Sequence, residues 1–230
     1  MQDLQFNPAR SLEIDIVSDV MCPWCYIGKR RLEKALAALP DIDFDVRWRP
    51  FQLDAAIPPE GMDRKEYLKR KFGDSRGGQM YREIVRAGEQ EGIAFGFERI
   101  ARAPNTLDAH RLIRWATTTG HQHEVVEALF SAYFVEGRDI GSRDVLVGIG
   151  AAAGMDPELV GRLLEGDADR EAVREEVQLA QRMGVSGVPC FILGGRYAVS
   201  GAQAPEILAD AIRQAMAAPG TSEPAPGPAS

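Results

Sequence analysis

Two cysteines separated by two residues form the pattern with the clearest chemical use in this chain. Cys22 and Cys25 enclose Pro23 and Trp24, and the third cysteine of the 230 residues is Cys190. A Cys-x-x-Cys pair can cycle between dithiol and disulfide, or it can supply half of a four-ligand zinc site. Three cysteines are too few for a disulfide-stabilised scaffold. The motif therefore indicates redox chemistry or metal binding.

Pro23 predicts which of the two thiols is the nucleophile. Proline is favoured at the first position of a helix, so Cys22 is expected at the N-cap and Cys25 one turn inside. At the N-cap, the free amides of Trp24 and Cys25 and the positive end of the helix dipole both favour a thiolate over a thiol. We therefore expect Cys22 to attack a disulfide and Cys25 to resolve the mixed disulfide.

Zinc binding is the main alternative for this pair. Zinc needs four ligands, and the remaining candidates are Cys190, His110, His121 and His123, with no second paired motif. A proline at the first helical position also suits the start of a redox helix better than a zinc knuckle. Redox chemistry is therefore the favoured interpretation, and zinc binding or plain structural burial of both thiols stays open.

The segments around the motif alternate between strand and helix patterns. Residues 11–19 alternate apolar and polar side chains, which predicts a strand ending just before Cys22. A helix is expected over residues 23–39, and Pro40 ends it. Residues 42–49 alternate most regularly, which predicts a half-exposed strand near a sheet edge. This β-α-β unit brings Cys22 to the carboxyl edge of the sheet, where α/β sites usually form.

The middle of the chain has helical periodicity and no convincing strand. From about Met62 to Met183 we expect six or seven helices. Strand patterns return over residues 190–199 as a hairpin around Gly194-Gly195, and a last amphipathic helix follows over residues 204–217. The two ends of the chain then complete one four-stranded mixed sheet, so the helical part is inserted rather than appended.

Several other side chains are expected to have structural roles. His110 lies near a predicted helix start and is a candidate for packing there or for modulating the site. The basic side chains of the first helix are interpreted as a solvated face, and four aromatic side chains as the core of the helical part. The two sets are Lys29, Arg30, Arg31 and Lys34, and Tyr67, Tyr81, Phe95 and Phe97.

The overall composition excludes several classes of partner. Hydrophobic residues make up 45% and charged residues 27% of the chain, as in ordinary globular proteins. A net charge of −7 argues against nucleic acid or an anionic membrane as the main partner. No segment approaches the ~20 apolar residues of a membrane span. The first residues lack the basic and apolar regions of an export signal, so a cytoplasmic location is expected.

Gly187-Val188-Pro189 directly precedes the predicted strand that starts at Cys190. A proline there can simply mark a strand start, because it lacks a donor for the ladder. Alternatively, a cis Val188–Pro189 bond would turn the amide and carbonyl of Val188 toward an extended substrate. Cys190 is interpreted as a buried apolar filler, and an alternative disulfide or redox-regulated state with Cys22 stays open.

Together these motifs resemble the DsbA family of thioredoxin-fold proteins. The resemblance spans residues 11–217 and rests on a strand followed by Cys22-Pro23-Trp24-Cys25, a helical insertion, and the segment that ends in Val188-Pro189. Within this family the chain most resembles the FrnE-like branch, which has a sequence similar to residues 105–111 (NTLDAHR) at the start of an inserted helix.

The resemblance implies an α/β, thioredoxin-like fold with an inserted all-helical domain. Residues 1–60 and 184–218 would form the thioredoxin-like domain, residues 61–183 the helical insertion, and residues 219–230 a disordered tail. It also implies that Cys22 is the nucleophile, that Cys25 is the resolving thiol and that Pro189 is a cis-proline facing the site. The residues expected to contact substrate are Pro23, Trp24, Val188 and Pro189.

The activity implied is that of a protein-disulfide oxidoreductase or dithiol–disulfide isomerase acting on protein or small-molecule disulfides. No bound cofactor or metal is expected, glutathione is a candidate redox partner, and the oligomeric state is left open. One rival is a glutathione-dependent transferase or hydroxychromene-carboxylate isomerase of the same superfamily, which usually has Ser where this chain has Cys22. The other rivals are a zinc-binding module and a chaperone-like module.

Overall fold

The central sheet joins strands from both ends of the chain in the computed structural model, which describes residues 11–73 and 77–217, without the side chains of residues 77–80. Its strand order is β2-β1-β5-β6. β1 pairs in parallel with β2 and antiparallel with β5, which pairs antiparallel with β6. The bounds are β1 Ser11–Ser18, β2 Asp43–Pro50, β5 Cys190–Leu193 and β6 Tyr197–Ser200. The predicted four-stranded mixed sheet is confirmed, with the regularly alternating β2 at an edge.

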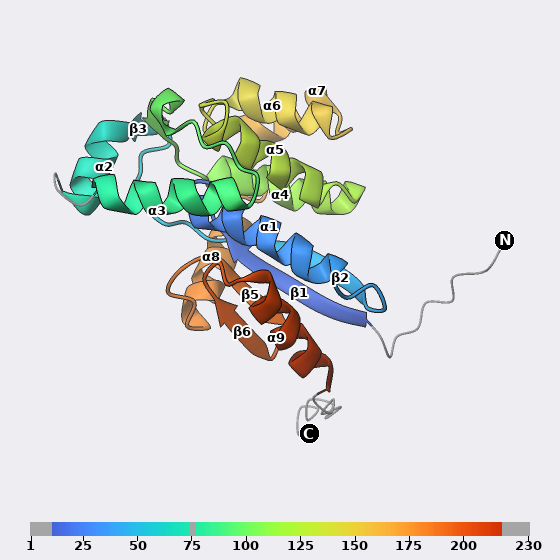
Figure 1. The fold of residues 1–230 in the computed structure, drawn as a ribbon. Coiled ribbons are helices and arrows are strands. Elements are labelled where there is room, and N and C mark those ends of the chain that lie inside the picture. Colours follow the sequence, from blue (N-terminus) through green and yellow to red (C-terminus); the bar gives the residue numbers. More distant parts are fainter. Residues whose placement is uncertain (1–10, 74–76, 218–230) are drawn as a thin grey trace.

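Helices cover both faces of this sheet (Figure 1). α1 (Pro23–Ala37) and α9 (Pro205–Ala217) pack against each other on one face. α8 (Arg170–Arg182) lies against the other face, where Ala180 contacts a small apolar cluster. Successive side chains of a strand point to opposite faces, so each central strand contributes to both layers.

The inserted segment is helical, as predicted. With α8 it holds seven α-helices in the described part of the chain, and none of these is long and apolar enough to cross a membrane. The expectation of no strand here is wrong in one detail, because β3 (Met62–Asp63) pairs antiparallel with β4 (Arg102–Ala103). Strands of two residues are too short to leave a periodic signal. The helices are α2 Arg64–Phe72, α3 Gly77–Gln90, α4 Leu107–Thr119, α5 Gln122–Phe134, α6 Arg143–Ala152 and α7 Pro157–Glu165, with a 3-10 turn at Phe97–Arg99.

The insertion and the sheet share one continuous hydrophobic core. Tyr26 of α1 stacks on Phe130 of α5, with ring centroids 5.0 Å apart and planes inclined by 10°. Trp48 of β2 meets the same Phe130 edge-on at 6.3 Å. Aromatic pairs of this kind stabilise a fold beyond the area that they bury. The expected domain boundaries stay a prediction, and the expected tail at residues 219–230 lies outside the described residues.

A buried ion pair network also joins α1 to the insertion. The Lys29 side chain is only 2% exposed, and its Nζ lies 2.5 Å from Glu33 Oε1 and 2.7 Å from Glu127 Oε2 of α5. Arg31 is mostly covered as well, with its Nε 2.8 Å from Glu91 Oε1. The prediction of a solvated basic face is therefore wrong for Lys29 and Arg31, because the insertion docks on this side of α1.

Candidate active site

Cys22 occupies the N-cap of α1. The helix begins at Pro23, and Cys22 has extended backbone angles, with φ −94° and ψ 113°. The Cys22 amide donates to the Asp19 carbonyl at 2.9 Å, and the Cys25 amide donates to the Cys22 carbonyl at 3.0 Å. The expected hydrogen bonds from the helix amides to the Cys22 sulfur are not formed, since the side chain makes no cap bond.

Cys25 lies one turn inside α1 and is the less accessible thiol of the pair. Its exposed fraction is 1%, against 4% for Cys22, and both are free thiols. Burial and the neighbouring Cys22 raise the pKa of the Cys25 thiol well above its usual range. Cys25 is therefore a neutral thiol in the folded dithiol, while Cys22 lines a cavity. The division of roles between the two thiols stays a prediction.

The segment before β5 forms the wall opposite Cys22. The Val188–Pro189 peptide bond is cis. The Cys22 thiol lies 3.7 Å from the Val188 carbonyl oxygen and points its donor toward it. Residues far apart in the sequence therefore meet at the Cys22 sulfur. Trp24 is half-buried next to it and lines the same cavity.

Gly28 allows Pro189 to approach α1 closely. A Cβ at position 28 would lie 2.8 Å from Pro189 Cγ and 3.2 Å from Phe191 Cζ. We expect Gly28→Ala to lower the free energy of unfolding by about 1–3 kcal/mol through overpacking. Gly148→Ala in α6 is the matched control, since a Cβ there meets nothing within 4 Å. The free energy of unfolding of Gly148→Ala should rise by about 0.5–1 kcal/mol, because alanine has the higher helix propensity. Urea denaturation measures both, and equal shifts in the two variants would contradict this packing.

Cys190 lies in a cluster separate from the Cys22–Cys25 pair. It is buried with Val17, Phe51 and Ala180 on the α8 side of the sheet. Burial raises the pKa of its thiol, as expected for a cysteine that fills apolar space.

Asp19 and His110 support the loop that carries Cys22. The Asp19 carboxylate is fully buried and accepts a hydrogen bond from the Leu53 amide at 2.7 Å. His110 Nε2 lies 3.5 Å from Asp19 Oδ1 and 2.9 Å from the Phe51 carbonyl oxygen. His110 thus packs under the site rather than lining the cavity beside Cys22. Asp19 was not predicted, although an acidic residue ending a buried strand just before the motif is a signal for such a role.

A cavity of about 330 Å³ opens beside Cys22 and is called the Cys22 cavity below. Tyr67 belongs to the buried core and Phe97 packs against it, as interpreted. The expectation that these aromatic residues line no pocket is wrong for Tyr67, Tyr81 and Phe97, which line this cavity. Arg64 also lines it and was not predicted. The sequence carries a weak indication of a role for Arg64, because a basic residue in the first turn of a helix is unfavourable with respect to the helix dipole and is therefore unusual there.

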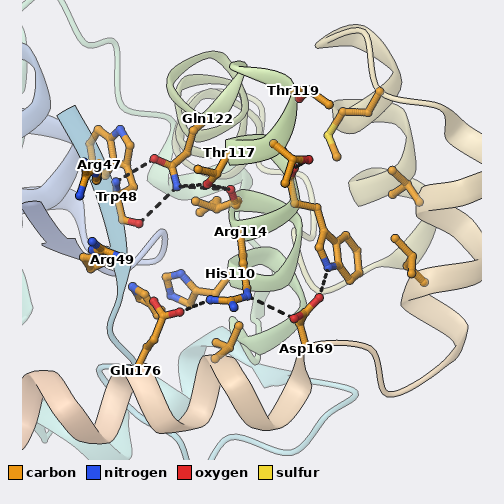
Figure 2. A pocket seen from close by; sticks show the side chains of 18 of the residues that line it. Arg47, Trp48, Arg49, His110, Arg114, Thr117, Thr119, Gln122, Asp169 and Glu176 are labelled. Carbon is orange, nitrogen blue, oxygen red and sulfur yellow. Dashed lines mark hydrogen bonds and ion pairs between the residues drawn. The ribbon is translucent and has the colours of Figure 1, made fainter. Parts of the chain in front are cut away.

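A larger cavity of about 650 Å³ lies between β2, α4, α7 and α8 (Figure 2). Its polar walls are paired within the protein: Arg114 donates to Asp169 and Glu176, and Gln122 bonds with the main chain of Trp48. Neither thiol of the pair lines it.

Among the residues that the structure describes, no group of three or more His, Cys, Asp or Glu side chains is arranged to hold a metal ion. The Cys22 cavity is thus the candidate active site.

Comparisons with known proteins give one consistent likeness. The family model described as a DSBA-like thioredoxin domain matches residues 13–213. The crystal structure of a probable DsbA oxidoreductase from Streptomyces coelicolor is 32% identical, with a TM-score of 0.85, over 92% of this chain and 93% of that chain. YwbO, an uncharacterised protein of Bacillus subtilis, is 26% identical over 206 residues, which are 88% of this chain and 96% of that protein. The cytosolic disulfide reductase DsbM from Pseudomonas aeruginosa, solved with GSH, shares the fold at 21% identity, with a TM-score of 0.62 over 88% of this chain and 98% of that chain.

Proposed function

Since the chain belongs to the DSBA-like thioredoxin domain family, we propose that it is a thiol–disulfide oxidoreductase working through Cys22 and Cys25. One observation carries this proposal: the Cys22 thiol sits at the N-cap of α1, at a cavity wall, and faces the Val188 carbonyl at 3.7 Å. The membership of the chain in the FrnE-like branch stays a prediction.

The proposed reaction has two exchange steps. The Cys22 thiolate attacks one sulfur of a substrate disulfide, a Cys22–substrate disulfide forms, and the other substrate sulfur leaves as a thiolate. Cys25 then loses its proton and attacks Cys22 Sγ, so that the second substrate thiolate leaves and a Cys22–Cys25 disulfide remains. Two electrons pass from the protein to the substrate, and the reverse sequence oxidises a substrate dithiol. The raised pKa of Cys25 keeps it from competing with Cys22 for the first attack.

Substrate contacts are proposed on both sides of the sulfur. Pro23 and Trp24 flank it on α1, and the main chain of Val188 before Pro189 can pair with an extended substrate. Glutathione is a candidate redox partner, and DsbM, the neighbour with GSH bound, is named a cytosolic disulfide reductase. A cytoplasmic site of action is part of the proposal and agrees with the expectation from the sequence.

The redox equilibrium of the Cys22–Cys25 pair against glutathione tests this function. After equilibration at graded ratios of reduced to oxidised glutathione, free thiols are alkylated and the protein is weighed by mass spectrometry. A reversible two-electron transition is expected. A midpoint near −120 mV would indicate an oxidant like DsbA, and one near −270 mV a reductant like thioredoxin, to within roughly 30 mV. Cys190→Ala should leave the midpoint unchanged and serves as the control.

Other outcomes would replace the proposal. A stable glutathione adduct on Cys22, without a Cys22–Cys25 disulfide at any ratio, would favour the glutathione-dependent transferase or isomerase. Stoichiometric zinc released by thiol modification would favour a metal-binding module. Suppression of client aggregation that is unchanged in Cys22→Ser, together with no disulfide transition, would favour a chaperone-like module.

A further inference from the structure

Arg64 is a buried cation in the wall of the Cys22 cavity. The residue is 9% exposed and begins α2. Its guanidinium donates to the Tyr81 hydroxyl at 2.8 Å and to the Tyr133 hydroxyl at 3.5 Å. The same group lies over the ring of Phe97, 5.5 Å from its centroid. Tyrosine hydroxyls and a ring face therefore hold this cation in place in the wall of the cavity that Cys22 also lines.

No carboxylate neutralises Arg64 among the residues that the structure describes. The two other buried Lys and Arg side chains of this part of the chain are both paired: Lys29 with Glu33 and Glu127, and Arg111 with Asp108. Arg64 has no such ion pair. Burial raises the pKa of Tyr133, which therefore stays a neutral phenol and supplies no counter-charge. Burying a cation without a paired anion is costly, so the site favours an anionic ligand.

The other described residues that line the cavity are basic, neutral or apolar. Lys71, an exposed side chain, lines it as a second cation, and none of the described residues that line it is Asp or Glu, although the chain carries a net charge of −7. Much of the remaining wall is apolar, with Leu53, Phe72 and Phe134 among the lining residues. An apolar cavity with a buried cation in its wall selects a ligand with an apolar body and an anionic group. At about 330 Å³ the space suits a small molecule.

We propose that the Cys22 cavity binds small disulfides and thiols with an aromatic or apolar body and an acid group, with the acid on Arg64 and the sulfur at Cys22. This assignment rests on the proposed function of the same site. In the exchange, Cys22 attacks one sulfur of the bound disulfide and forms a mixed disulfide with that half of the ligand, and the other half leaves as a thiolate. Cys25 then attacks Cys22 Sγ and releases the first half as a second thiolate. The dithiol loses two electrons and the ligand disulfide gains them.

Two aromatic disulfides that differ in charge test the role of Arg64. Reduced protein is mixed with 5,5′-dithiobis(2-nitrobenzoate), which carries carboxylates, or with uncharged 4,4′-dithiodipyridine, and the rate constant of the first exchange is measured by stopped flow. Arg64→Gln should lower the rate constant for the carboxylate probe, relative to that for the uncharged probe, at least about tenfold, because a charge-assisted contact is lost. Arg64→Lys should restore part of the ratio. Arg174→Gln changes the net charge equally at an exposed site on α8 and should leave the ratio unchanged.

A binding measurement separates this inference from the redox function. In the Cys22→Ser background, isothermal titration calorimetry compares naphthalene-2-carboxylate with naphthalene-2-carboxamide. The carboxylate should bind at least about tenfold more tightly than the carboxamide, and Arg64→Gln should remove this preference. If Arg64→Gln does not fold, Arg64→Lys is measured instead and should keep only part of the preference. Equal affinities would overturn the inference even where disulfide exchange is intact. Selective carboxylate binding in a protein without a Cys22–Cys25 redox couple would instead overturn the proposed function alone.

A macromolecular substrate is the remaining outcome. Oxidation of a reduced, unfolded protein is measured with the same Arg64 and Arg174 variants. No change in this rate is expected, because a protein substrate would pair with the main chain of Val188 rather than contact Arg64. A tenfold loss in Arg64→Gln that matches the loss for the anionic probe would overturn the assignment to small molecules.

Discussion

Cys22→Ser is expected to abolish disulfide exchange, with a loss of rate on the order of a thousandfold or more. A serine hydroxyl is not a useful nucleophile toward sulfur at neutral pH, and no other thiol can take over. Of the three cysteines only Cys22 lines the cavity, and burial raises the pKa of the Cys25 and Cys190 thiols. Turnover of a fluorescent disulfide substrate measures the loss. Retention of a tenth of the activity would show that Cys22 is not the nucleophile.

Cys25→Ser gives the complementary result because it removes only the second step. Cys22 should still attack, and the reaction should stop at a Cys22–substrate disulfide that mass spectrometry detects as one adduct per protein. The Cys22→Ser/Cys25→Ser variant is the control for adducts on Cys190. Full turnover by Cys25→Ser with glutathione present would instead indicate a monothiol mechanism, in which glutathione resolves the intermediate.

The second large effect concerns stability. Glu33→Gln/Glu127→Gln should lower the free energy of unfolding by about 3 kcal/mol, because it leaves the Lys29 ammonium buried without a carboxylate. This value is at the low end for buried pairs, since the two glutamate side chains are 34% and 30% exposed. Urea denaturation at neutral pH measures it. A loss below about 0.5 kcal/mol would show that the network is energetically neutral.

A third substitution isolates Lys29 within this network. Adding Lys29→Met to the double variant removes the unpaired charge and should recover most of the lost stability. Arg30 and His123 lose the same glutamate partners in both variants, so the difference between them reports on Lys29. If the added substitution has no effect or destabilises further, the Lys29 charge is solvated and the structural explanation is wrong.

The pH dependence of stability provides another readout. Partial burial opposes ionisation of Glu33, but hydrogen bonds from His123 and Lys29 and the charge of Arg30 outweigh it and lower its pKa from 4.5 to about 2. A lowered pKa means that the folded state favours the carboxylate. Its stabilisation is therefore complete above about pH 4.5 and is lost as the pH falls toward 2. Glu33→Gln should flatten this part of the stability profile.

The features that could be predicted from the sequence depend on local signals. Pro23 marks the start of α1 and therefore the N-cap position of Cys22. The alternation of residues 42–49 identifies β2 and its place at the sheet edge. Asp156 followed by Pro157 predicts the start of α7, where the Asp156 carboxylate accepts hydrogen bonds from two backbone amides. Each of these patterns is decided within a few residues of the chain.

The features that could not be predicted depend on how the insertion docks. Lys29 is on the polar side of α1 by its spacing, and it is buried because α5 brings Glu127 over it from almost a hundred residues away. Tyr67, Tyr81 and Phe97 are typical core residues by type, yet they also line a cavity. The Arg64 guanidinium lies over the rings of Tyr81 and Phe97 in the same wall. Periodicity reports which side of an element is apolar, but it does not report which surface that side will meet.

The position of β5 between β1 and β6 has a consequence for how this chain is synthesised. β1 with the Cys22 motif leaves the ribosome long before its antiparallel neighbour β5 and the Val188 wall, because the whole helical insertion lies between them. Until then the nascent chain carries an accessible Cys-x-x-Cys pair beside an unpaired strand edge, a state prone to wrong disulfides and aggregation. Pairings between distant segments also slow folding. The dithiol is therefore enclosed only after the insertion and β5 have both been synthesised.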